Sequence, residues 1–397
     1  MAVAGIIAEY NPFHRGHAWQ IAELRRLLGE DTAVVVAMSG NFVQRGDFAI
    51  VSKHARAEMA LLGGADLVLE IPTLWACAGA ERFALGGAAV LSGTGAVTHL
   101  VFGAECGDLP RLQAAARALE DPAYPELLRR QLAGGITFAA ARQRAVEELT
   151  GQPCPALEKP NNNLAVEYLR ALRLLGSGME LVALPRVGAD HDSAEVQEFS
   201  SASAIREAIL SGGEWAALVP DTSREILARE FAAGRGPVCM DAARRQILSR
   251  LRAMGEEDFR PYDGGGEGLY HRFYSAVREA SSVEELLALA KTKRYPLARL
   301  RRMLMQSYLG LTVPEKGDTP AYIRVLAANS RGREVLKTMR ETASLPVVTQ
   351  PGEIRRMGER AQRLFEEESR CTDQYTLSWP AVGAPDLEFK TGPVIRP

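Results

Sequence analysis

The stretch VAGIIAEYNPFHRGH, residues Val3 to His17, decides the fold of this chain. It opens with a short apolar run, Val3 to Ala8, which lacks polar alternation and is typical of a strand buried on both faces. Helical periodicity follows from Ala18 to Leu28. Phosphate groups bind between such a strand and such a helix, because free backbone N–H groups and the helix dipole point at the ligand. The stretch therefore predicts an α/β fold with a phosphate site after its first strand.

Short apolar runs continue to alternate with helical stretches over the first two hundred residues. Further strands are expected at 33–37, 66–71, 99–102 and 180–184, and helices at 54–62, 82–91 and 163–175. This alternation is typical of a Rossmann-like parallel sheet, in which helices connect the strands. A helical insertion, about 109–150, is expected between the last two strands.

The second half of the chain has a different pattern. After Ser211 the strand signals largely stop, and residues from about 215 onward show mainly helical periodicity. We therefore place a domain boundary near residue 220, with an α/β domain at 1–220 and a mainly α-helical domain at 221–397. The last thirty or so residues contain several prolines and are compatible with strands or with an irregular tail.

The composition is that of a globular chain able to bury sizeable cores. Its 397 residues are 47% hydrophobic and 24% charged, and the formal net charge is -2, so a nucleic-acid partner would need a local basic patch. The five cysteines form no CxxC pair, which suggests neither a zinc site nor a disulfide framework. We expect reduced thiols and a cytoplasmic location. No apolar stretch is long enough to cross a bilayer, so no membrane association is expected.

Two histidines, His14 and His17, stand three residues apart where the first helix begins. Side chains with this spacing can reach one ligand, and imidazoles that donate to phosphate oxygens stabilise charge that grows in a transition state. Gly16 allows close approach of the backbone. The alternatives are two solvent-facing turn histidines, or a metal pair with no obvious third ligand nearby. The position after the first strand favours a catalytic role for both histidines, and no protein metal site is predicted.

A serine-rich segment, Phe199 to Arg206, begins another helix after the fifth expected strand. Serine hydroxyls and the N–H groups of a first helical turn form an anion-binding nest, and Arg206 can add charge-assisted hydrogen bonds to phosphates. On its own such a segment is most often only a helix cap. Together with the histidine pair it favours a second phosphate-contacting segment.

These two motifs resemble the HxGH and SSxSxIR signatures of the nucleotidylyltransferase superfamily, although Ala202 replaces the more usual serine or threonine. A closer resemblance, to the tRNA(Met) cytidine acetate ligase family, covers most of the chain. It rests on seven segments in the expected order: GIIAEYNPFHRGHAWQ, SGNFVQRGDFAIVSKHARAEMAL, GADLVLEIP, FGAE, KPNNNLAVEYLRAL, PRVGADHD and KRYPLARLRRML.

The resemblance implies an ATP-dependent ligase with a nucleotidyltransferase domain followed by a tRNA-binding helical domain. Acetate and ATP would give acetyl-adenylate and pyrophosphate, and the acetyl group would pass to N4 of the wobble cytidine of elongator tRNA(Met), forming N4-acetylcytidine. Mg²⁺ is expected to accompany ATP, and no obligate protein partner is inferred. Two alternatives stay open: an adenylyltransferase acting on a phosphorylated small molecule, and a non-catalytic nucleotide- or RNA-binding protein.

The resemblance also implies ATP contacts residue by residue. For Asn161 and Asn162 the other interpretation is N-capping of a helix, and for Arg186 it is a solvated loop arginine. Gly103 ends the fourth strand, where a ligand can approach the backbone. The implied contacts are Ile7, Ala8, Glu9, Tyr10, Asn11, Pro12, Phe13, His14, Gly16, His17, Gln20, Gly103, Asn161, Asn162, Arg186, Ser201, Ser203 and Arg206.

A polar stretch, Ser39 to Arg56, lies between the second strand and the next helix. Its side chains could line the pocket for acetate and the tRNA end. Lys53 and Arg56 are preferred over Arg45, since the helix would fix their direction. We predict a catalytic role for Lys53, and the alternative is a solvated loop and helix face.

The run KTKRYPLARLRR, residues Lys291 to Arg302, has six basic residues and no acid. Phosphate backbones bind such clusters, although a basic helix by itself is usually a solvated face. Next to a nucleotide-activating site, the run predicts tRNA contact. The predicted tRNA-binding residues are Lys291, Lys293, Arg294, Arg299, Arg301 and Arg302.

Overall fold

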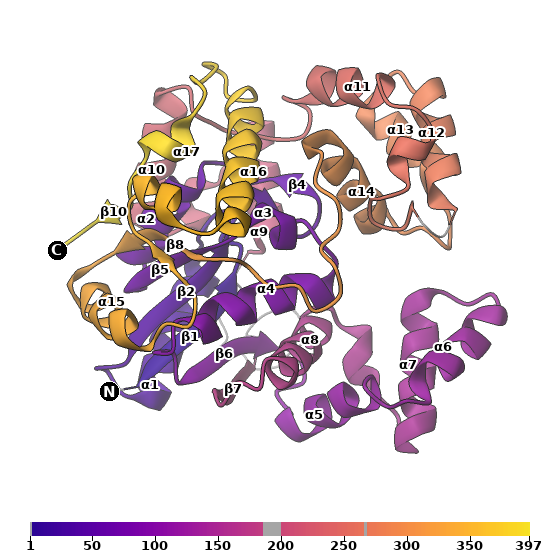
Figure 1. Ribbon diagram of the computed structural model, residues 1–397, viewed down its shortest axis with the longest axis horizontal. Coiled ribbons are helices and arrows are strands. Elements are labelled where there is room, and N and C mark those ends of the chain that lie inside the picture. The colour runs from indigo at the N-terminus through magenta and orange to yellow at the C-terminus, as the bar shows by residue number, and fades with distance from the viewer. Residues whose placement is uncertain (1, 186–199, 266–267) are drawn as a thin grey trace.

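A mostly parallel β-sheet forms the centre of the computed structural model, which describes residues 2–185, 200–265 and 268–397 (Figure 1). The strand order is β10-β8-β5-β2-β1-β6-β7, with β9 beside β8, and every pair from β5 to β7 is parallel. This confirms the predicted α/β fold. The strands are β1 (Val3–Ala8), β2 (Ala33–Ser39), β5 (Leu67–Ile71), β6 (His99–Ala104), β7 (Glu180–Pro185), β8 (Ile323–Ala328), β9 (Val347–Val348) and β10 (Val394–Ile395).

Helices cover both faces of the sheet, which explains why its strands are apolar on both sides. In β2, Val34 and Val36 pack toward α1, α2, α9 and α10, whereas Ala33 and Val35 pack toward α4, α8 and α15. The covering helices are α1 (Arg15–Leu28), α2 (Lys53–Leu62), α4 (Ala80–Gly93), α8 (Pro160–Leu174), α9 (Ala202–Ser211), α10 (Asp221–Ala232) and α15 (Ser330–Thr342).

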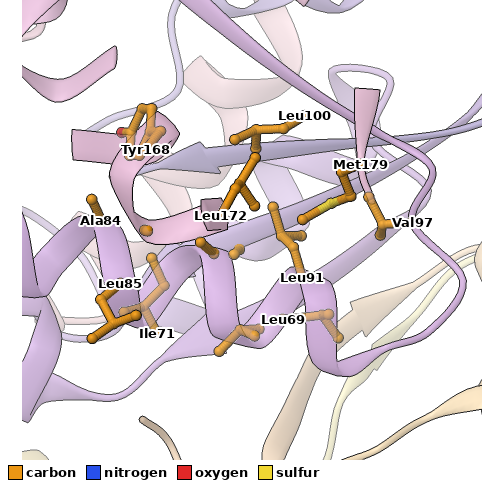
Figure 2. Close-up of a cluster of buried hydrophobic side chains, with 14 of the residues drawn as sticks. Leu69, Ile71, Ala84, Leu85, Leu91, Val97, Leu100, Tyr168, Leu172 and Met179 are labelled. Atoms are coloured by element: carbon orange, nitrogen blue, oxygen red, sulfur yellow. The ribbon is translucent and has the colours of Figure 1, made fainter. Parts of the chain in front are cut away.

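Figure 2 shows part of the hydrophobic cluster between α4, α8 and the sheet. Leu85 and Leu91 of α4 gather with Leu69 and Ile71 of β5, and Leu172 of α8 joins them. Full burial of one such side chain contributes about 1.5–3 kcal/mol. This layer therefore anchors the sheet firmly, and the loops at the carboxyl ends of the strands start from a rigid edge.

Two helical groups lie beyond the sheet (Figure 1). The first lies between β6 and β7, where the helical insertion was expected, and contains α5 (Leu109–Ala118), α6 (Tyr124–Ala133), α7 (Phe138–Thr150) and η1 (Pro155–Glu158). The second is a helical bundle with its own core of buried side chains, including Phe273, Leu286 and Leu300. Its elements are α11 (Arg244–Arg252), η3 (Glu257–Phe259), α12 (Leu269–Glu279), α13 (Val283–Ala290) and α14 (Leu297–Leu309).

The chain then returns to the sheet, which corrects the expectation that strands largely stop after Ser211. β8 pairs antiparallel with β5, and β10 pairs with β8. Every residue of β8 is buried, and a short, fully buried run has no alternation that would separate strand from helix. The proposed boundary at 220 stays a prediction, but 323–397 does not continue the bundle.

The remaining elements connect these layers. They are β3 (Phe42–Val43), β4 (Asp47–Phe48), α3 (Thr73–Ala76), η2 (Ala216–Leu218), η5 (Pro351–Arg356), α16 (Glu359–Thr376) and α17 (Leu387–Lys390). Within the described ranges, no helix has both the length and the apolar character that a membrane span requires.

Candidate active site

The loop after β1 carries the histidine pair in a conformation held by its own side chains. Tyr10 adopts a φ of 46°, a left-handed conformation that is uncommon for a residue other than glycine, and its ring is buried. The Asn11 amide bridges the loop to the next segment: its Oδ1 accepts from the Ile50 N–H at 2.8 Å, and its Nδ2 donates to the Phe48 carbonyl at 3.4 Å. The loop is therefore shaped before any ligand binds.

His14 and His17 cap helix α1 reciprocally. The Nδ1 atom of His14 accepts from the Gly16 N–H at 3.1 Å, and the Nδ1 atom of His17 accepts from the His14 N–H at 3.2 Å. An accepting ring nitrogen carries no proton, so these hydrogen bonds assign the Nε2-protonated tautomer to both neutral imidazoles. The two rings stack with their centroids 3.7 Å apart. Both rings therefore carry their N–H on Nε2 at the N-terminus of α1, a position that favours anions.

The serine-rich segment lies against this loop, as the sequence predicted. Ser201 is the N-cap of α9, and its hydroxyl accepts from the Ala204 N–H at 3.2 Å. One turn later, the Arg206 guanidinium donates to the Asn11 carbonyl at 2.7 Å and to the Ser203 hydroxyl at 3.2 Å. The two segments that the sequence predicts to contact phosphates are therefore joined directly, because Arg206 bonds both Ser203 and the histidine loop.

Arg56 of α2 bonds the backbone at the carboxyl ends of β1 and β2. Its side chain is fully buried, and its guanidinium donates to backbone carbonyls: Glu9 at 2.5 Å, Ser39 at 3.1 Å, Val51 at 3.2 Å, and also Gly40. Burial lowers the pKa of Arg56 to about 10, so it keeps its charge at neutral pH. These hydrogen bonds favour a positioning role for Arg56, and its predicted place in an acetate pocket stays a prediction.

The asparagine run has a cap that the sequence did not reveal. The Glu105 carboxylate, after β6, accepts from the backbone N–H groups of Asn161 and Asn162 at 3.1 and 2.8 Å, and from the Asn161 side chain at 2.6 Å. The Asn162 Oδ1 accepts in turn from the Cys106 N–H at 3.2 Å. Glu105 thus caps α8 and fixes both asparagines beside the end of the strand that holds Gly103. The partners are 56 and 57 residues apart, and local pattern carries no signal over that distance.

Lys53 lies in a buried ionic cluster. Its ammonium is 2.6 Å from a Glu70 carboxylate oxygen and 2.7 Å from one of Glu388, and its side chain is 1% exposed. Burial acts to lower the pKa of Lys53, but the charges of Glu388, Glu70 and Glu368 outweigh it and raise the pKa. This pairing ties α2 to β5 and α17. The catalytic role predicted for Lys53 stays a prediction, and the geometry favours a structural one.

A cavity of about 290 Å³ lies beside this cluster. Lys53, His54 and Glu388 line one part of it, and Arg229 and Glu230 of α10 line another. Burial lowers the pKa of His54 to about 3, and the charge of Lys53 adds to the effect. None of the ATP contacts implied by the resemblance lines this cavity, which separates it from the histidine loop.

Comparison with known proteins finds relatives that are similar over the whole length of the chain. The HIGH Nucleotidyl Transferase family matches residues 1–386. The tRNA(Met) cytidine acetate ligase of Acetivibrio thermocellus is 36% identical over 415 aligned positions, which cover 100% of both chains. The chain belongs to the tRNA(Met) cytidine acetate ligase family. The ligase of Thermotoga maritima is 37% identical over 399 positions, covering 94% of this chain and 95% of its own.

Two crystal structures of Thermotoga maritima TmcAL share the fold. Each is 34% identical to this chain, covers 100% of it and 99% of the other chain, and superposes with a TM-score of 0.92. One is the apo form, and the other is bound with alpha-thio ATP. The agreement of fold and family extends through the bundle and the returning C-terminal strands.

In this member of the family, the basic run divides into two parts. Lys291, Lys293 and Arg294 are exposed in the loop before α14. On the helix itself, Arg302 pairs with Asp263 at 2.7 Å, and Arg299 lies 3.8 Å from the same carboxylate. Arg301 lies 3.9 Å from Asp47 of the β3–β4 hairpin. The helical arginines are therefore held by acids that the sequence pattern did not connect to them.

The structure does not locate every predicted contact. Arg186 lies outside the described residues, so its assignment stays a prediction. Ile7 packs its side chain close to Gly87 of α4 and would meet a ligand only through its backbone. No group of three or more histidine, cysteine or acidic side chains suited to a metal ion occurs in the described part of the chain.

Proposed function

We propose that this chain activates acetate with ATP and transfers the acetyl group to a cytidine of tRNA(Met). The observation that carries the proposal is the pair of hydrogen bonds by which His14 and His17 cap α1. The Nδ1 atom of each ring accepts a backbone N–H, which assigns the ring N–H to Nε2 where α1 begins. Donors of this kind match oxygens of the α- and β-phosphates, where negative charge develops during displacement at phosphorus.

In the first step an acetate oxygen attacks the α-phosphorus, the bond to the bridging oxygen of pyrophosphate breaks, and acetyl-adenylate forms. Acetate supplies its own carboxylate nucleophile, so no protein nucleophile is required. Ser201, Ser203 and Arg206 contact the phosphates from α9. We expect Mg²⁺ to be bound through the triphosphate oxygens, because this ion retains several waters and prefers substrate phosphates to an all-protein cage.

In the second step the exocyclic amine of the wobble cytidine attacks the acetyl carbonyl carbon. The mixed anhydride bond breaks, AMP leaves, and the amine loses one proton as N4-acetylcytidine forms. The exposed part of the basic run supports binding of the tRNA backbone. The substrates therefore place this activity in the cytoplasm.

The test is ATP/pyrophosphate exchange by purified protein with magnesium, with and without acetate. Exchange that requires acetate, followed by transfer of labelled acetate to a transcript of elongator tRNA(Met), is the expected result. AMP transfer to a phosphorylated small molecule, without acetate-dependent exchange, would instead identify an ordinary adenylyltransferase. Binding of nucleotide and RNA with no turnover would identify a non-catalytic relative.

A further inference from the structure

The β3–β4 hairpin joins the histidine loop to the helical bundle. On one side, the Gln44 N–H donates to the Glu9 carboxylate at 2.8 Å, and the Asn11 side-chain amide donates to the Phe48 carbonyl. On the other side, the tip of the hairpin packs onto α14. Gly46 has a φ of 69°, and a Cβ built there would lie 2.4 Å from the backbone carbon of Arg301. Only glycine fits this contact, so the hairpin and α14 are in close, specific contact.

Three arginines from three separate elements converge at this junction. Arg45 comes from the hairpin, Arg206 from α9 and Arg301 from α14. Burial lowers the pKa of Arg206. The charges of Asp47 and Glu9 act to raise this pKa, and those of Arg45 and Arg301 act to lower it further. Arg206 is therefore within electrostatic reach of the other four groups.

Two of these arginines retain unused hydrogen-bonding capacity. Within the described part of the chain, no hydrogen bond or ion pair engages the exposed Arg45 guanidinium. Arg301 meets only Asp47, at 3.9 Å, its Nε–H has no hydrogen-bond partner there, and 38% of its side chain is exposed. A 3.9 Å ion pair is loose, and a phosphate oxygen could replace the carboxylate with shorter, charge-assisted bonds.

We propose that Arg301 of α14 and the exposed Arg45 of the hairpin that packs on it form a subsite for a phosphodiester of the tRNA substrate beside the nucleotide loop. The inference rests on the proposed function, since it places the acceptor RNA next to the acetyl-adenylate. Asp47 competes with the RNA phosphate for the Arg301 guanidinium and discourages other anions from binding there. The triphosphate of ATP has the same chemistry and is the rival occupant.

The test compares Arg45→Gln, Arg301→Gln and Asp47→Asn, with Arg340→Gln on the exposed face of α15 as a matched control. Transfer of labelled acetate to an unmodified elongator tRNA(Met) transcript gives the KM for tRNA, and exchange gives the KM for ATP. Each arginine variant is expected to raise the KM for tRNA about five- to tenfold and to reduce the salt slope of transcript binding by about 0.7–0.9. Asp47→Asn is expected to lower that KM about two- to fivefold.

The KM for tRNA is expected to change in opposite directions in the arginine variants and in Asp47→Asn, and this distinguishes a subsite from a structural ion pair. If Asp47→Asn weakens tRNA binding as Arg301→Gln does, the pair serves only to hold the hairpin, and the proposal is wrong. A raised KM for ATP with an unchanged KM for tRNA would assign the arginines to the triphosphate. Unchanged values for both would also overturn the subsite. If wild-type protein does not acetylate the transcript, the proposed function fails, whereas direct binding of the transcript to the same variants still tests the subsite.

Discussion

The nucleotide loop carries two histidines and the basic run carries six cationic side chains, but the protein presents these groups in opposite ways. In the loop, His14 and His17 are bound to backbone groups of the protein itself, and Arg56 of α2 donates to the backbone of the same loop. In the run, Lys293 and Arg294 extend into solvent. Fixed donors stabilise a transition state because they need no reorganisation, whereas mobile surface charges supply affinity that salt screens. The comparison separates residues for chemistry from residues for binding.

The largest expected effect comes from removing one fixed donor. His17→Ala should lower acetate-dependent ATP/pyrophosphate exchange by about 10²–10³-fold, the cost of losing one preorganised donor to a developing charge. His271→Ala, on the exposed face of α12, is the control. Circular dichroism should show an intact fold for both variants. Exchange at the wild-type rate in His17→Ala would remove the histidine pair from the mechanism.

The second effect concerns the residue that shapes the loop. Arg56→Met leaves the carbonyls of Glu9, Ser39 and Gly40 buried without their donor. Urea denaturation should therefore show a free energy of unfolding lower by about 3–5 kcal/mol, as when one partner of a buried charged network is removed. Arg340→Met, an exposed arginine of α15, should change it by less than about 0.5 kcal/mol. A similar small loss for Arg56→Met would show that the loop holds its own shape.

A third prediction tests the mobile charges of the comparison. Replacing Lys291, Lys293 and Arg294 together by glutamine should weaken binding of the tRNA transcript about tenfold near 0.1 M salt, and should reduce the salt slope by about 2. Lys337→Gln on α15 should leave binding unchanged. Fluorescence anisotropy over a salt series measures both quantities. An unchanged slope would mean that this part of the run is an ordinary solvated surface.

The last prediction is a pH dependence in the buried ionic cluster. Burial, with the neighbouring Glu70 charge, raises the pKa of Glu368 to about 8. In the unfolded chain Glu368 loses its proton near pH 4.5, whereas in the folded chain it keeps the proton up to about pH 8. The contribution of this protonated carboxyl to the free energy of unfolding is therefore fully present below pH 4.5 and is lost as the pH rises toward 8. Glu368→Gln cannot ionise. The free energy of unfolding of wild type, relative to this variant, should therefore fall between pH 5 and pH 8, and a flat difference would show that Glu368 is already charged.

Particular elements show how far sequence reasoning reaches. The strands β1 and β2, helix α1 and the insertion were predicted closely, because each has a strong local period or a Pro/Gly break. The histidine pair and Arg206 were predicted as one site, and the structure joins them through the Asn11 carbonyl. β8 was missed because a fully buried run of six residues has no alternation. Lys53 was predicted to line a pocket and does line a cavity, but its ion pair with Glu388, 335 residues away in the chain, was not predicted.

By itself, the sequence determined the α/β alternation, the position of the phosphate loop and the family to which the chain belongs. These depend on apolar period, on helix capping and on short motifs, which are all local. Only the tertiary structure decided which long-range partner each charged group takes: Arg56 with four carbonyls, Glu105 with the start of α8, and Arg301 with Asp47. Buried charges are stable only where solvent is replaced by specific partners. Those partners come together when distant strands and helices pack, and no local pattern specifies them.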